Sequence, residues 1–173
     1  MKKRHQKAME LLDTSGARLH ALLARLTLSE DIVGDLMQEL FIRLCRSRGF
    51  DKAKDPFAYA YRVAINLAFE WRRNLRPRFQ SLDEDCLPAE NRPSSLGIMI
   101  QAEQLQRVLD ATSQLSSLAR DVVIMRYIEQ EPYEEIGRRL GKKPQYVRSV
   151  CAKALARLRA LLVDEKDDPN AKE

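Results

Sequence analysis

Basic side chains gather in two segments of this sequence, and both segments carry the residue types that bind phosphate. Between Arg138 and Val163 there are eight Lys or Arg residues and neither Asp nor Glu. A second basic run follows Trp71 and consists of Arg72, Arg73, Arg76 and Arg78. An acidic stretch, residues 81–90, lies between the two. Basic clusters of this kind indicate a phosphate backbone as partner, and a merely solvated helix face is the plainer alternative.

Residues that could do catalytic or metal chemistry are few and scattered. The chain has two histidines, His5 and His20, and three cysteines, Cys45, Cys86 and Cys151. It has neither a Cys-x-x-Cys pair nor a Gly-rich phosphate loop. We therefore expect a non-enzyme with no catalytic residue, no metal and no cofactor, whose thiols stay reduced in the cytoplasm. No apolar run reaches the length of a membrane span, so we also expect no membrane insertion.

Apolar periodicity predicts that the elements carrying these residues are helices. Ile32, Leu36, Leu40 and Leu44 recur every four residues, which places them on one helical face, and Ser29 just ahead is a candidate N-cap. A polar loop follows this helix. This loop covers residues 46–55, and the remaining periodic segments are an earlier helix rich in leucine up to residue 26 and two helices over 98–111 and 117–129.

Proline and glycine positions mark where the other helices begin and end. Pro56 opens the helix that carries the second basic run, and Pro77 is expected to end it. Pro132 opens a further helix that ends at Gly141, and Pro144 opens the last one. Each of these residues acts through its own backbone restrictions, so the boundaries follow from local chemistry.

The periodicity is lost between the two basic segments, where acidic residues and prolines alternate. We predict an all-α protein with two small helical domains, a bundle over residues 1–76 and a helix-turn-helix domain over 98–163. Residues 77–97 are predicted to form a flexible linker, and residues 164–173 a charged tail.

Residues 133–150 have the spacing of a helix-turn-helix. Ile136 lies on the packing face of the first helix, and Gly137 is small where the two helices cross. Gly141 stands at the turn, a position that often needs a left-handed backbone. Val147 anchors the second helix against the first. Such a motif presents the start of its second helix to base edges in the major groove, whereas a hairpin that binds nothing, or binds protein, is the alternative.

Two blocks of motifs resemble the sigma-70 family of RNA polymerase sigma factors. Residues 35–44, DLMQELFIRL, resemble region 2.2 of that family, and residues 55–73 resemble regions 2.3 and 2.4. Residues 115–162 are similar to region 4. Counterparts of regions 1 and 3 are missing, which is the layout of the extracytoplasmic-function (group IV) sigma factors.

The resemblance implies a sigma factor that binds core RNA polymerase and directs promoter-specific transcription initiation. Region 2 would engage and open the −10 element, and region 4 would read the −35 element. The implied partners are core RNA polymerase and promoter DNA, and an anti-sigma factor is a further partner that the resemblance leaves open. Two rivals are a helix-turn-helix regulator that binds DNA without acting as a sigma subunit, and a helical adaptor for an acidic protein.

The resemblance also implies roles for particular residues. The polar stripe that would bind core polymerase consists of Asp35, Gln38, Glu39 and Arg43. The residues that would handle the −10 element are Tyr59, Arg62, Asn66, Trp71, Arg72, Arg73 and Arg76. Those that would meet the −35 element are Lys142, Lys143, Gln145, Tyr146, Arg148, Ser149, Ala152 and Lys153. Trp71 also falls on the apolar stripe of its helix, and Asn66 is equally compatible with a buried structural amide.

Overall fold

In the computed structural model, the backbone is described for residues 2–79 and 95–164, and the side chains for residues 3–74 and 103–163. Every regular element within these ranges is a helix, so the predicted all-α fold is confirmed. The elements in chain order are α1 (Lys2–Thr27), α2 (Val33–Arg46), α3 (Arg48–Lys52), α4 (Pro56–Phe79), α5 (Ser95–Ser113), α6 (Ser117–Val123), the π-helical turn η1 (Ile124–Ile128), α7 (Tyr133–Leu140) and α8 (Pro144–Asp164).

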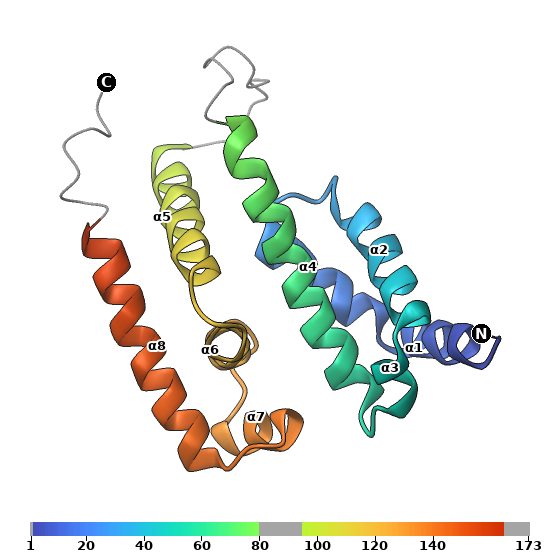
Figure 1. The fold of residues 1–173 in the computed structure, drawn as a ribbon. Helices are drawn as coiled ribbons and strands as arrows, with labels where there is room; N and C mark the ends of the chain where they lie inside the picture. The colour runs from blue at the N-terminus through green and yellow to red at the C-terminus, as the bar shows by residue number, and fades with distance from the viewer. Residues whose placement is uncertain (1, 80–94, 165–173) are drawn as a thin grey trace.

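Helix α4 is the element around which the two halves of the chain are arranged. It packs against α1, α2 and α3 on one side and against α5 and α6 on the other (Figure 1). Leu23 of α1 and Ile65 of α4 are fully buried, and they belong to the same cluster of buried side chains as Met125 and Ile136. The hydrophobic core therefore runs without a break from the first half into the second.

The start of α2 differs from the sequence prediction. Ser29 is not its N-cap, because α2 begins at Val33 and Ile32 occupies the cap position without a side-chain hydrogen bond. Ser29 instead pairs with Thr27, whose hydroxyl donates to the Ser29 carbonyl at 3.0 Å. Its role is in the turn between α1 and α2, so the sequence rule identified a polar turn residue but the wrong helix boundary.

The end of α4 also differs from the prediction, because the helix continues through Pro77 to Phe79. A proline in the last turn of a helix removes only one backbone hydrogen bond, and the helical hydrogen bonds end within a few residues of that position in any case. Residues 95–97 are helical as well, since α5 begins at Ser95. The rest of the predicted linker, residues 80–94, and residues 165–173 of the predicted tail lie outside the described residues.

The predicted loop over residues 46–55 contains the short helix α3. Ser47 caps this helix, because its Oγ accepts hydrogen bonds from the N–H groups of Gly49 and Phe50 at 3.1 and 3.2 Å. Phe50 is fully buried, and the Tyr59 hydroxyl lies 2.7 Å from the Ser47 Oγ. One cap and one buried ring thus fix a segment that has too few residues to show periodicity.

The helix-turn-helix of α7 and α8 is confirmed. Gly141 has φ +64° and ψ +36°, the left-handed conformation expected at the turn. Gly137 is required by a close approach, since a Cβ at this position would lie 2.6 Å from the backbone oxygen of Lys142. The Lys142 N–H donates to the Gly137 carbonyl at 2.8 Å, so the turn is held tightly against the first helix.

Replacing Gly137 by alanine should destabilise the second half of the chain. The added Cβ would meet backbone rather than a movable side chain, and overpacking of this kind costs about 1–3 kcal/mol of unfolding free energy. Gly16→Ala is the matched control, because Gly16 lies inside α1 and a Cβ there meets only Leu12 Cβ at 3.9 Å. It should stabilise by roughly 0.5–1 kcal/mol. Urea unfolding followed by circular dichroism measures both, and a neutral Gly137→Ala would contradict the close approach.

Candidate nucleic-acid and polymerase interface

The residues expected to meet duplex DNA lie on one exposed surface at the start of α8. All eight of them are exposed, namely Lys142, Lys143, Gln145, Tyr146, Arg148, Ser149, Ala152 and Lys153. The opposite side of α8 is buried through Val147, Cys151 and Ala154, which pack toward the rest of the second half. Packing and exposed positions therefore alternate along the helix as the sequence predicted, and the exposed surface carries only basic charges.

Arg148 is the residue of this surface that its neighbours orient most directly. Its guanidinium lies 5.4 Å from the ring centroid of Tyr133, at the start of α7, and its Nη2 is 3.4 Å from Glu134 Oε1. Its side chain is nevertheless 62% exposed. Stacking on an aromatic face limits the conformations of a long side chain while leaving the guanidinium donors accessible. The contacts with α7 thus orient the Arg148 side chain at the start of α8 while its guanidinium stays open to solvent.

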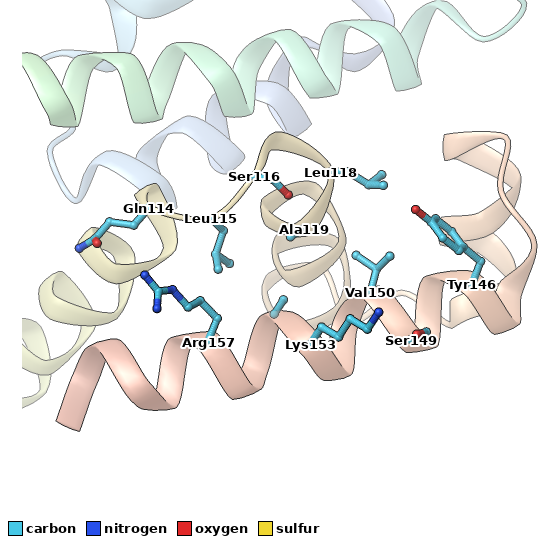
Figure 2. Close-up of a pocket in the computed structure, with 11 residues that line it drawn as sticks. Gln114, Leu115, Ser116, Leu118, Ala119, Tyr146, Ser149, Val150, Lys153 and Arg157 are labelled. Atoms are coloured by element: carbon cyan, nitrogen blue, oxygen red, sulfur yellow. The ribbon is translucent and has the colours of Figure 1, made fainter. Parts of the chain in front are cut away.

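A groove of about 380 Å³ runs beside this surface, between α6 and α8. Figure 2 shows Tyr146 and Val150 projecting from α8 toward Leu118 and Ala119 of α6. Lys153 lines the same groove. The predicted −35 surface is therefore concave along this edge, with an apolar floor and a basic rim.

The stripe predicted to bind core polymerase lies on the outer side of α2. Asp35 and Gln38 are exposed. Arg43 Nε donates to Glu39 Oε1 at 2.8 Å, and its Nη2 lies 2.8 Å from Glu70 Oε2 on α4. The hydrogen bond with Glu70, followed by that with Glu39, raises the pKa of Arg43. This part of the stripe is a fixed ion-pair network that also ties α2 to α4.

Two residues predicted to handle the −10 element contact the second half of the chain. Arg62 Nε donates to Asp121 Oδ2 on α6 at 3.1 Å, and Asn66 Oδ1 accepts from Arg120 Nη2 at 2.6 Å. Arg120 also lies over the ring of Phe69, 4.9 Å from its centroid. The structure therefore brings Arg62 and Asn66 together on one face of α4 and covers that face with α6.

The other residues predicted for the −10 element are dispersed. Tyr59 is half-buried and pairs with Ser47, while Trp71 is half-buried and packs against the main core cluster. Arg73 is exposed. The side chain of Arg76 lies outside the described residues. Of the three whose side chains the structure describes, Arg73 is the one presented to solvent.

Arg72 has a structural environment rather than a solvent-facing one. Its side chain is 3% exposed, and its guanidinium pairs with Asp110 of α5 at 2.7 Å. It also donates to the backbone oxygens of Leu26 and Gln106, each at 3.2 Å. In this arrangement a phosphate does not reach Arg72, and the basic run of α4 divides into an inward residue and an outward one, Arg73.

Sequence reasoning missed the charged residues through which α6 contacts α4. Arg120 and Asp121 are 5% and 1% exposed, and burial lowers the pKa of Arg120 and raises that of Asp121. Their signal in the sequence was faint. They directly precede Val122 and Val123, and all four consecutive residues are buried, so α6 has no solvent-facing side at these positions.

Among the described residues, no group of three or more His, Cys, Asp or Glu side chains is placed to hold a metal ion. In the same part of the chain, no helix is long and apolar enough to cross a membrane. Cys45 and Cys151 are buried thiols, and burial raises the pKa of Cys45.

Comparison with known proteins agrees with the two halves of the fold. Residues 11–78 match the family described as Sigma-70 region 2, and residues 111–160 match Sigma-70, region 4. The RNA polymerase sigma-E factor of Streptomyces avermitilis is 31% identical over 175 residues, covering 98% of this chain and 94% of that protein.

Two further relatives are also RNA polymerase sigma factors. The ECF RNA polymerase sigma factor SigE of Mycolicibacterium smegmatis is 31% identical over 169 residues, covering 92% of this chain and 63% of that protein. The RNA polymerase sigma factor CarQ of Myxococcus xanthus is 26% identical over 156 residues, covering 88% and 87%. This chain belongs to the sigma-70 family and is a sigma factor of the extracytoplasmic-function group that directs transcription initiation.

Arg72→Ala should lower the stability of the protein, whereas Arg73→Ala should not. The first change leaves the Asp110 carboxylate and two backbone oxygens without their buried donor, which costs about 3 kcal/mol. The second removes an exposed arginine from the next position of the same helix, where changes stay within about 0.5 kcal/mol. Thermal unfolding of both variants measures the difference, and equal midpoints would show that Arg72 does not stabilise the fold.

Proposed function

We propose that this sigma factor binds core RNA polymerase through the stripe on α2, engages the −10 element through α4 and reads the −35 element through α8. The observation that carries the proposal is the exposure of all eight predicted residues at the start of α8. Arginine and lysine supply the charge that phosphates attract, and the first turns of a recognition helix reach the base edges. The matched family regions support the order of these surfaces along the chain.

The proposal gives the chain no catalytic step of its own. Nucleotidyl transfer belongs to the polymerase, and the sigma factor contributes binding and strand capture. Its place of action is the cytoplasm, where core polymerase and promoter DNA are found. An anti-sigma factor is a further proposed partner.

On α4, the proposal uses the predicted residues that are exposed or half-buried. Arg62 and Arg73 are exposed arginines that can contact phosphates, and Asn66 offers an amide to an unstacked base. Trp71 and Tyr59 offer aromatic faces, although each is half-buried here. Arg72 contributes indirectly, because it holds α4 and α5 together.

Changing Gln38 and Glu39 to alanine should weaken assembly with core polymerase. Both side chains stand on the outer stripe of α2, and losing two central polar contacts of an interface raises the dissociation constant roughly tenfold or more. The matched control is Gln6→Ala with Glu10→Ala, an exposed glutamine and glutamate that pair with each other on α1. It should assemble normally.

Titration of labelled core polymerase measures assembly, and transcription from a promoter library with the purified core enzyme tests the function itself. Wild-type protein should start transcription at a defined subset of promoters. Unchanged affinity of the α2 double variant would remove Gln38 and Glu39 from the interface, while a lack of any promoter-directed transcript would contradict the function as a whole.

Arg148→Ala should change which promoter sequences are preferred, because a guanidinium in the major groove pairs bidentately with guanine. The loss on the preferred site should be roughly 1–3 kcal/mol, with discrimination flattened at one base position. Lys153→Ala is the control from the same helix, since an exposed lysine further along α8 is placed for backbone contact. It should weaken all sequences alike and reduce the salt slope by about one contact. Binding-site selection decides the matter. A variant at Arg148 that keeps its full sequence preference would show a phosphate contact instead.

A further inference from the structure

The face of α4 that holds two proposed −10 contacts is already occupied by α6. Asp121 accepts from Arg62 at 3.1 Å, and Arg120 donates to Asn66 at 2.6 Å. We propose that Arg120 and Asp121 compete with promoter DNA inside the same molecule, Asp121 standing at Arg62 in place of a phosphate and Arg120 occupying the Asn66 amide in place of a base. The inference rests on the proposed role of α4.

The chemistry of the two contacts fits such an exchange. A guanidinium pairs with carboxylate and phosphate through the same donors, so Arg62 keeps a charge-assisted partner in both states. The side chain of Arg62 is 49% exposed, whereas that of Asp121 is 1% exposed. The DNA-binding partner of the pair thus stands at the rim, where an incoming strand can reach it before α6 has left.

The docked contact leaves some of its polar atoms without partners. Arg120 Nε and Asp121 Oδ1 are buried and lack a hydrogen bond. Burial also raises the pKa of Asp121 and lowers that of Arg120, so each charge is disfavoured where it lies. Undocking returns these atoms to water and offsets part of what the contact contributes. Such a contact is suited to reversible opening.

The surface on α8 is in a different situation. Its predicted DNA-facing residues are exposed while α6 is docked on α4, with Arg148 62% exposed. The docked protein should therefore bind duplex DNA through α8 as well as an opened one does. Competition should appear only when single-stranded DNA binds through α4. A difference between single-strand and duplex affinity therefore separates the proposal from a general change in affinity for DNA.

The test compares full-length Asp121→Asn with Glu103→Gln. Both variants remove one negative charge from the second half, but Glu103 is an exposed residue of α5 that pairs with Arg107. Asp121→Asn should bind fluorescein-labelled single-stranded DNA of mixed sequence roughly tenfold tighter than wild type, since one charge-assisted hydrogen bond no longer competes. Its radius of gyration by small-angle scattering should increase. Glu103→Gln should match wild type in both measurements, and duplex affinity should be equal in all three proteins.

Arg120→Met provides a second variant in case Asp121→Asn fails to fold. Methionine retains an apolar stem against Phe69 and loses the bond to Asn66. This change removes a positive charge, which alone would weaken DNA binding, so tighter single-strand binding can come only from the freed face of α4. Equal single-strand affinity of wild type and the folded α6 variants overturns the competition.

Failure of the competition is distinguishable from failure of the proposed function. Once the protein is bound to core polymerase, Arg73→Ala should slow open-complex formation whether or not α6 competes with DNA, because Arg73 is exposed in the docked state as well. If that variant opens promoters at the wild-type rate, the role of α4 is wrong. If it is impaired while the α6 variants bind single strands like wild type, the role of α4 stands and the competition does not.

Discussion

The buried guanidinium of Arg72 fixes how the second half of the chain lies on the first. An arginine keeps its charge inside a protein, so burying one requires acceptors for its guanidinium, and here both Nη atoms of Arg72 have them. Here the acceptors are the Leu26 carbonyl near the end of α1, the Gln106 carbonyl and the Asp110 carboxylate of α5. The first comes from the last turn of a helix, where carbonyls have lost their helical partners. Because these acceptors belong to two elements besides α4, the arginine joins three helices. Once α5 is held there, the short connection through residues 114–116 leaves α6 against α4.

The position of α8 follows from that of α6. Its apolar side packs against α5, α6 and α7, and Gly137 allows the turn before α8 to approach α7 closely. The same packing turns the basic side of α8 outward. The two proposed DNA surfaces therefore differ in their accessibility within one structure. That on α8 is complete and exposed, whereas that on α4 is partly covered by the element that anchors α8.

The sequence predicted the features that depend on neighbouring residues. Apolar spacing located the helices, and Pro56, Pro144 and Gly141 marked their ends through backbone restrictions that act locally. Local rules were wrong where two preferences competed. At Pro77 the helix continues to Phe79 although the proline removes one backbone hydrogen bond. Helix α3 was missed because five residues show no period, although Ser47 before it is an ordinary cap.

For the candidate site, the sequence identified the exposed surface of α8 because a helix with one packed side leaves only the other for binding. It could not separate Arg72 from Arg73, which are adjacent arginines that face opposite environments. Nor could it predict the contacts of Arg62 and Asn66 with α6, because those partners are more than fifty residues away along the chain. Whether a polar side chain is buried depends on which distant element covers it, and periodicity within one helix carries no information about that.

The charged pair on α6 is better explained by two states than by the docked state alone. A well-packed apolar pair at positions 120 and 121 would hold α6 to α4 at least as well, because a buried ion pair seldom exceeds hydrophobic packing in stability. Such a pair would, however, be exposed to water whenever α6 left α4, as an apolar patch beside Val122 and Val123. Arg120 and Asp121 are well solvated in the open protein and acceptably paired in the docked one. The chain therefore gives up some strength in the contact between its halves, and it adds no apolar side chains at positions 120 and 121 to the surface that opening exposes.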